Sequence, residues 1–381
     1  MSALIIKGGM VYDPFKKKYE KQDLGIKDGR ILLEYKEDIQ ETEAEIVDAG
    51  DCVIVPGLID YHIHLYTGCD GGVSADPICL PSGVTTAVDG GTCGASSFEM
   101  FVKSDIERAL TEVKGYLNIS SGGLASGLYP ENIDPVYYEK EKIKYLFGKY
   151  PDRLTALKLR LSKNIAGLLG LTREPLEKTI EIAEEIGCPV VVHMTDPVIS
   201  PEEAASIMRP GDVFCHMYYG KGDTIIDEEG HVKKEILKAR ERGVLFDGCN
   251  GKNNFAFQVA APAAEEGFWP DIISTDISPM SFYRHPVVNM PRLLSKYMAM
   301  GMSFKQVIDC ATIAPARQLG MEKELGSLET GTAADILILK IKEQPVSFYD
   351  YAGNFVNGTK VIVPQMTIKS GNIVFCQSDF H

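Results

Sequence analysis

The sequence predicts an α/β protein in which a (β/α)8 TIM barrel is joined to a small β-sandwich formed from both termini. The first observation behind this prediction is a regular alternation of strand-like and helix-like segments through the middle of the 381-residue chain. The second is a set of short, extended-looking segments at each end. The third is the composition, with 45% hydrophobic and 24% charged residues, which is typical of a globular protein and excludes a disordered one.

Each end of the chain consists of a few short strand-like segments, which are too few to bury much apolar surface without the other end. A hairpin turn is expected at Lys27–Gly29, and a second turn at Ser370–Gly371. The strands expected here are Ala3–Lys7, Gln22–Lys27, Arg30–Glu34, Glu45–Asp48, Ala334–Lys340, Lys360–Ile368 and Asn372–Cys376. We therefore expect residues 1–54 and 323–381 to form one composite β-sandwich domain, with the catalytic barrel of residues 55–322 inserted between them.

The barrel prediction depends on eight apolar, β-branched runs that are separated by amphipathic segments such as Pro175–Ile186. The eight runs are Val53–Leu65, Thr85–Gly90, Gly115–Ser120, Leu154–Ser162, Pro189–Met194, Asp212–Met217, Val244–Gly248 and Asp271–Ile277. An open doubly wound sheet is the alternative, but it usually has fewer strands. No Gly-x-Gly-x-x-Gly motif follows the first run, which also favours the barrel.

The charge balance, the lack of a targeting pattern and the cysteine spacing indicate which partners and which cell compartment to expect. Acidic residues outnumber basic ones by 53 to 39, so no nucleic-acid partner is expected, because phosphate contact needs clustered Lys and Arg. The first residues lack a signal-peptide pattern, and no stretch approaches the ~18 apolar residues of a membrane span. The nine cysteines include no Cys-x-x-Cys pair. We expect a cytoplasmic protein with no membrane partner.

Four histidines stand at the ends of predicted barrel strands. His62 and His64 end the first strand, and side chains two apart on a strand point the same way. His193 ends the fifth strand and His216 ends the sixth. A lone histidine in such a place is more often a hydrogen-bonded core residue than a ligand. Four imidazoles at one end of a barrel, however, suit a zinc-like metal ion.

Two further charged residues stand on predicted strands. Asp276 ends the eighth run, where a carboxylate is costly unless it is paired or ligated, or unless it caps the next helix. Lys158 lies within the fourth run, on the same face as Arg160, so that two cations would repel each other. A carbamate formed on Lys158 with carbon dioxide would be an anionic ligand able to bridge two metal ions. A salt bridge from Lys158 to Asp276 or to another acid is the alternative.

This set of four histidines, a lysine and an aspartate resembles the ligand set of the amidohydrolase superfamily. Supporting motifs are Val55–Asp60, Gly83–Thr86 and Gly331–Asp335, and the resemblance covers essentially the whole chain. Within the superfamily the sequence is similar to a dihydroorotase-like bacterial group with members named deacetylase, D-aminoacylase or adenine deaminase. The motifs for that likeness are Asp89–Thr92, Asn118–Ser120 and Lys158–Ser162.

The resemblance implies a binuclear centre of two divalent metal ions, with Zn²⁺ as the expected metal. His62, His64 and Asp276 would hold one ion, and His193 and His216 the other. Carbamylated Lys158 and a hydroxide would bridge them. The segment after the seventh strand departs from the group's Gly-His-Gly pattern, because Phe246–Gly251 contains no histidine.

The reaction expected from this centre is attack of the metal-bridging hydroxide on an amide or ester carbonyl, with Asp276 as general acid and base. The substrate would be a small N-acyl or O-acyl carboxylic acid or a cyclic amide. One alternative is an adenine-deaminase-like aminohydrolase that releases ammonia. The other is a non-catalytic barrel, which would be expected to have lost metal ligands.

The candidates for binding this small-molecule substrate lie on or after the barrel strands, where such proteins build their pockets. They are Asn118, Arg160, Tyr218, Asn250, Arg284 and His285. Arg160 could clamp a carboxylate, because its planar fork matches carboxylate geometry, or it could form an internal ion pair. Ordinary loop packing is the alternative for the others. A homo-oligomer is suggested by family analogy alone.

Overall fold

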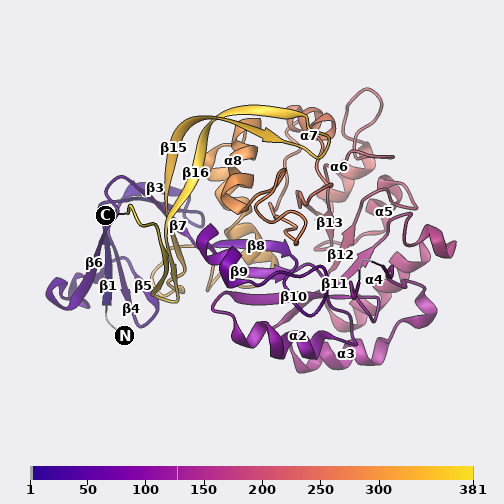
Figure 1. Ribbon diagram of the computed structural model, residues 1–381, viewed down its shortest axis with the longest axis horizontal. Coiled ribbons are helices and arrows are strands. Elements are labelled where there is room, and N and C mark those ends of the chain that lie inside the picture. The colour runs from indigo at the N-terminus through magenta and orange to yellow at the C-terminus, as the bar shows by residue number, and fades with distance from the viewer. Residues whose placement is uncertain (1–2, 127, 381) are drawn as a thin grey trace.

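A seven-stranded parallel sheet forms the centre of the molecule in the computed structural model, which describes residues 3–126 and 128–380 (Figure 1). Its strands are β8 (Leu58–Ile63), β9 (Val84–Asp89), β10 (Glu112–Asn118), β11 (Leu154–Arg160), β12 (Val190–His193), β13 (Val213–Cys215) and β14 (Leu245–Asp247). They follow one another in chain order across the sheet. The mixed α/β class is therefore confirmed, and each of these strands overlaps one predicted run.

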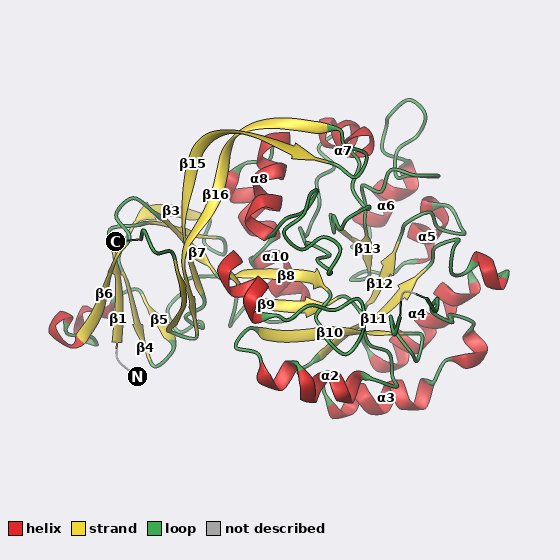
Figure 2. Ribbon diagram, in the orientation of Figure 1, coloured by secondary structure: helices red, strands yellow, loops and turns green. Residues whose placement is uncertain are grey.

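Helices separate and cover these strands, as Figure 2 shows. They are α1 (Asp76–Cys79), α2 (Phe98–Ser104), α3 (Lys140–Lys149), α4 (Glu174–Ile186), α5 (Pro201–Ile207), α6 (Lys234–Glu241), α7 (Phe257–Glu265), α8 (Met290–Met300), α9 (Phe304–Cys310) and α10 (Ile313–Gln318). Short 3-10 turns lie at Tyr35–Glu37, Glu41–Glu43, Leu80–Ser82, Ile106–Arg108, Pro135–Tyr137 and Gly167–Leu169. The helix starts show local causes, such as the capping box of Ser303 and Gln306 on α9. Among the described residues, none of these helices has the length and apolarity needed to cross a bilayer.

The predicted eighth strand, Asp271–Ile277, is an extended segment rather than a regular strand. Its backbone accepts a hydrogen bond from Gly248 at Ile272 and donates one from Asp276 to the His62 carbonyl at 2.7 Å. The amide of Thr275 instead donates to the Asp60 carboxylate, and Asp276 has a left-handed φ of 52°. Both features interrupt the regular hydrogen-bond pattern of a β-strand. The segment is still hydrogen-bonded to residues at the ends of both edge strands, β8 and β14.

The two ends of the chain pair with each other. One sheet contains β1 (Ala3–Lys7), β4 (Leu24–Lys27), β5 (Arg30–Leu32) and β6 (Ala44–Asp48). The other contains β2 (Met10–Asp13), β3 (Lys18–Lys21), β7 (Val53–Pro56), β15 (Ile336–Tyr349), β16 (Phe355–Lys369) and β17 (Asn372–Cys376). Buried apolar side chains from both sheets, including Ile6 and Ile338, form one cluster.

The predicted first run, Val53–Leu65, divides into two strands at Gly57. Strand β7 pairs with β15 in the terminal sheet, whereas β8 pairs with β9 in the parallel sheet. Gly57 marks the division, since its amide donates to the Asp335 carbonyl at 2.8 Å. This division places β8, which ends at the first histidine pair, entirely in the parallel sheet.

Strands β15 and β16 are much longer than predicted and form a hairpin that arches over α8 (Figure 1, yellow ribbons). The Ser295 hydroxyl of α8 accepts a hydrogen bond from the amide of Ile362 at 2.9 Å. At the hairpin tip, the Asp350 carboxylate accepts one from the amide of Phe257, at the start of α7, at 3.2 Å. The carboxyl-terminal hairpin therefore reaches the loops that follow the last strands of the parallel sheet.

Candidate metal centre

The structure brings all six predicted metal ligands together at the carboxyl-terminal edge of the parallel sheet. The Asp276 Oδ1 atom lies 3.1 Å from Nε2 of His64 and 3.8 Å from Nε2 of His62. Lys158 Nζ lies 3.4 Å from the same nitrogen of His62. The remaining two ligands, His193 and His216, approach each other to 2.8 Å between Nδ1 and Nε2, and the His62 and His216 ring centroids are 5.8 Å apart.

Outer contacts decide which nitrogen of each imidazole faces the centre. Nδ1 of His216 lies 2.6 Å from the backbone carbonyl of Cys249, which can only accept, so this nitrogen carries the proton. Nδ1 of His64 lies 2.7 Å from the Thr92 hydroxyl, whose own proton goes to the Asp89 carboxylate. Both rings therefore present an unprotonated Nε2 to the centre.

The other two histidines follow the same principle. Nδ1 of His62 lies 3.4 Å from the Cys215 sulfur, which leaves Nε2 towards Asp276. For His193 the roles are exchanged, because Nε2 contacts the Thr195 hydroxyl at 2.5 Å and Nδ1 faces His216. The unprotonated Nε2 atoms of His64 and His216 face a carboxylate and a second imidazole nitrogen, and lone pairs in such positions repel unless a proton or a metal cation lies between the two groups. The donor set thus fits divalent metal ions.

Burial and neighbouring charges shift the pKa values of three of these ligands towards the protonation states that metal binding requires. Burial, reinforced by the charge of Lys158, lowers the pKa of His62 to about 4. Burial and the neighbouring His216 also hold the pKa of His193 well below its usual value. Burial acts to raise the pKa of Asp276, but the contact with His64 and the charges that nearby imidazoles carry when protonated outweigh it, and the pKa is about 2. These shifts favour neutral imidazoles at His62 and His193 and an ionised carboxylate at Asp276, whereas the neighbouring Cys215 raises the pKa of His216 against the effect of burial.

Asp276 and Lys158 can now be compared with their alternative roles. The next helix after Asp276 begins only at Met290, so Asp276 does not cap it. Its Oδ2 atom accepts a hydrogen bond from Asn254 at 2.8 Å, which fixes the carboxylate. Among residues 3–126 and 128–380, no carboxylate forms an ion pair with the buried Lys158 ammonium, whose contacts are with His62 and the Tyr116 ring.

The predicted substrate-binding residues fall into three sets: two that contact Glu131, two that are fully buried, and two that are exposed. Arg160 forms an ion pair with Glu131 at 2.6 Å, and Asn118 donates to the same buried carboxylate at 3.0 Å. Tyr218 is fully enclosed, and its hydroxyl donates to the Phe268 carbonyl.

Asn250 is also fully buried and contacts the Tyr297 hydroxyl at 2.9 Å. Arg284 and His285 are exposed, with the His285 ring 5.0 Å from that of Tyr349 on the hairpin. Of the candidates, only Arg160, Arg284 and His285 retain exposed surface.

Several residues that complete the centre had no assigned role in the sequence analysis. Thr92 and Asp89, which orient His64, belong to a motif noted only for its family likeness. Cys215 and Cys249 approach His62 and Asp247 closely enough for all four to share a metal ion, and their positions at strand ends could have indicated this. Glu131, in contrast, lies in a loop without periodicity, so no sequence pattern indicates its contact.

Comparison with known proteins agrees with the fold and identifies the family. The amidohydrolase family model matches residues 53–374. A deacetylase from Brucella anthropi is 29% identical over 344 residues, which cover 90% of this chain and 85% of the relative. The crystal structure of an adenine deaminase is similar with a TM-score of 0.89 at 27% identity, and that of a dihydroorotase with 0.88 at 25% identity. Each of these two structural comparisons covers 98% of this chain and 99% of the solved structure's chain.

Proposed function

The chain belongs to the amidohydrolase family, and from that premise we propose that it is a hydrolase with two divalent metal ions that removes an acyl group from a small carboxylic acid. The observation that supports this most directly is the orientation of the four imidazoles. Each ring contacts an outer partner through one nitrogen and turns the other towards Asp276, Lys158 or a second imidazole.

The proposed ligand assignment follows these contacts. His62, His64 and Asp276 would hold one ion, and His193 and His216 the other, with carbamylated Lys158 between them. Nitrogen and carboxylate ligands of this kind suit Zn²⁺. When bound, such ions polarise a substrate carbonyl and lower the pKa of water to about 7. The lack of a carboxylate partner for Lys158 among the described residues supports the carbamate, because an anionic modification would remove a buried, unpaired cation.

Asp276 is placed to move the proton. Its Oδ2 atom is held by Asn254, while Oδ1 points to the two histidines of the first strand. In hydrolysis a water oxygen adds to the carbonyl carbon, and the bond from that carbon to nitrogen or oxygen breaks. We assign Asp276 the role of taking the proton from the water and delivering it to the leaving atom.

The terminal domain and the barrel form part of the same proposal. Residues 1–54 and 323–381 would act as one β-sandwich domain, supported by the sheet and the apolar cluster that both ends share. Residues 55–322 would form the (β/α)8 barrel, supported by the hydrogen bonds that segment Asp271–Ile277 makes to both edges of the parallel sheet.

A panel assay tests the reaction class. The metal-loaded protein is mixed with N-acyl amino acids of both hands, acylated hydroxy acids, cyclic ureides and aminopurines, and protons and ammonia are followed in the same wells. We expect proton release without ammonia from an acyl compound, in line with the relative named deacetylase. Ammonia from an aminopurine, without acyl cleavage, would replace the proposal by a deaminase, for which the likeness to the adenine deaminase structure provides a basis.

A steric prediction tests the ligand assignment. Gly90 follows β9, and a Cβ atom at this position would lie 2.4 Å from Nε2 of His62. The substitution Gly90→Ala should therefore displace this imidazole and weaken Zn²⁺ binding at least about tenfold, as measured by chelator competition. Gly148→Ala is the control, because a Cβ atom there meets nothing within 4 Å. Unchanged Zn²⁺ affinity in Gly90→Ala would contradict the role of His62.

A further inference from the structure

Helix α8 contains a buried lysine that the proposed mechanism does not use. Lys296 is 1% exposed, and its ammonium lies 3.9 Å from the centre of the Phe255 ring. Burial lowers the pKa of Lys296 to about 7, and the charge of Asp350 on the hairpin only partly opposes this effect. A buried cation is costly unless a specific contact compensates for it, so its contacts call for an explanation.

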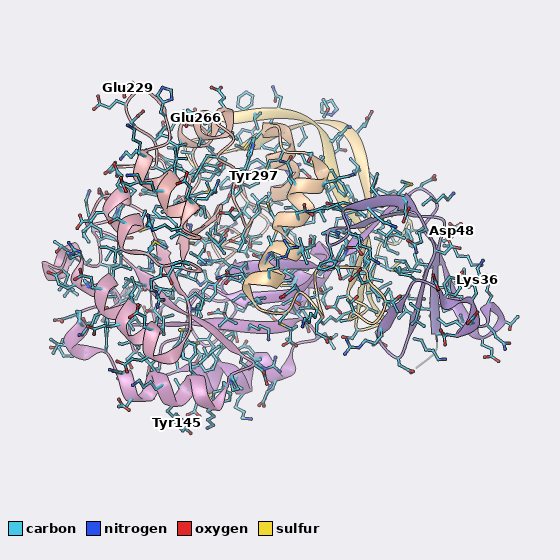
Figure 3. The ribbon with its side chains drawn as sticks, turned by 180° about the vertical axis from the view of Figure 1, so that it is seen from behind. Lys36, Asp48, Tyr145, Glu229, Glu266 and Tyr297 are labelled. Atoms are coloured by element: carbon cyan, nitrogen blue, oxygen red, sulfur yellow. The ribbon has the colours of Figure 1, made fainter. Side chains whose placement is uncertain are left out.

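The main polar contact of Lys296 is the side chain of Asn250. In the amide orientation that satisfies both partners, the Asn250 oxygen accepts from Lys296 Nζ at 2.6 Å. The amide nitrogen then donates to the Tyr297 hydroxyl at 2.9 Å and to the Gly248 carbonyl at 3.3 Å. Figure 3 marks Tyr297 on α8. Two consecutive residues of one helix thus hold both ends of a single amide.

Asn250 lies in the middle of the strand-seven loop, which we define as residues 248–254. The loop contacts the metal centre at two points, since the Cys249 carbonyl accepts from His216 and Asn254 donates to Asp276. Between these points the loop passes close to the carboxylate, because a Cβ atom on Gly251 would lie 2.2 Å from Asp276 Oδ2. A shift of the loop would therefore move groups that contact ligands in both halves of the proposed centre.

We propose that Lys296 is a positioning residue for the metal centre, and that it acts by holding Asn250 and hence the strand-seven loop. The Cys249 carbonyl then keeps the proton of His216 on Nδ1, and Asn254 keeps the Asp276 carboxylate in place. This inference rests on the proposed function. It also gives a role to Asn250, which receives the contact from α8.

The test is metal binding by Lys296→Met, which keeps an unbranched apolar chain against Phe255 but removes the charge. Zn²⁺ affinity is measured by chelator competition, and ligand geometry by the visible spectrum of the Co²⁺-substituted protein. We expect a loss of affinity of about 10–100-fold, as for other outer contacts of metal ligands, together with a changed Co²⁺ spectrum. The control is Lys114→Met, because Lys114 is also buried but donates to the Asp152 carbonyl. Its affinity and spectrum should match those of the wild type.

A milder variant covers the case in which Lys296→Met does not fold. Tyr297→Phe removes only the hydroxyl that contacts Asn250, and it should weaken Zn²⁺ binding in the same direction by a smaller factor. Wild-type affinity and an unchanged Co²⁺ spectrum in a folded Lys296→Met protein, or in Tyr297→Phe if only that variant folds, would overturn the role of Lys296 and leave the proposed function standing. A wild-type protein that binds neither metal would overturn both.

Discussion

The substitution Asp276→Asn is expected to lower kcat by about 10²–10⁴-fold, the usual contribution of a general acid or base, while the fold and bound metal persist. The amide has nearly the shape of the carboxylate, and its single oxygen can take the Oδ1 position that faces His62 and His64. It cannot take a proton from water and return it to a leaving group. Steady-state kinetics on the substrate identified by the panel, together with elemental analysis of the same sample, measures both quantities.

The matched control is Asp271→Asn, at the opposite end of the same segment. The Asp271 carboxylate pairs with Arg240 and accepts from the amide of Phe246, so it contributes to folding without touching the centre. This control should keep kcat close to the wild-type value. Near-normal kcat in an Asp276→Asn protein that holds its metal would show that another group moves the proton.

The second large effect is expected for Lys158→Ala, which should reduce the metal content from roughly two ions per chain to well below that value. The reason is the loss of the proposed bridging carbamate from a buried position between His62 and the Tyr116 ring. Short carboxylic acids such as acetate or propionate should partly restore metal content and activity, since they can supply a carboxylate in the space that the side chain leaves.

Arg160→Ala provides the comparison, because it also removes a cation from β11. Its guanidinium pairs with Glu131 rather than with a predicted metal ligand, so metal content should stay close to that of the wild type. Elemental analysis with and without added carboxylate distinguishes the two variants. Full metal occupancy in Lys158→Ala would exclude a bridging role for this lysine.

The local pattern of apolar and β-branched residues predicts some strands of this fold correctly and fails for others. Strands β9 to β14 overlap the predicted runs, because burial on both faces of a parallel sheet requires continuous apolar, β-branched sequence. The same pattern predicted a regular eighth strand at Asp271–Ile277. The amide of Thr275, however, donates its hydrogen bond to the Asp60 carboxylate instead of to a neighbouring strand. The length of the β15–β16 hairpin was also missed, because its outer half is supported by contacts with other elements rather than by its own apolar pattern. Arg292 of α8 donates to the Ser347 carbonyl, and the amide of Phe257 at the start of α7 donates to Asp350.

For the site, the sequence by itself determined which residue types stand at the strand ends, because side chains alternate with a period of two along a strand. That local rule placed His62 and His64 together, and the tertiary structure adds Asp276 within 3.8 Å of both. Only the tertiary structure decided the protonation pattern, in which His216 donates to the Cys249 carbonyl. It also decided the partner of Lys296, because contacts between segments far apart in the chain arise from packing and leave no periodic trace in the sequence.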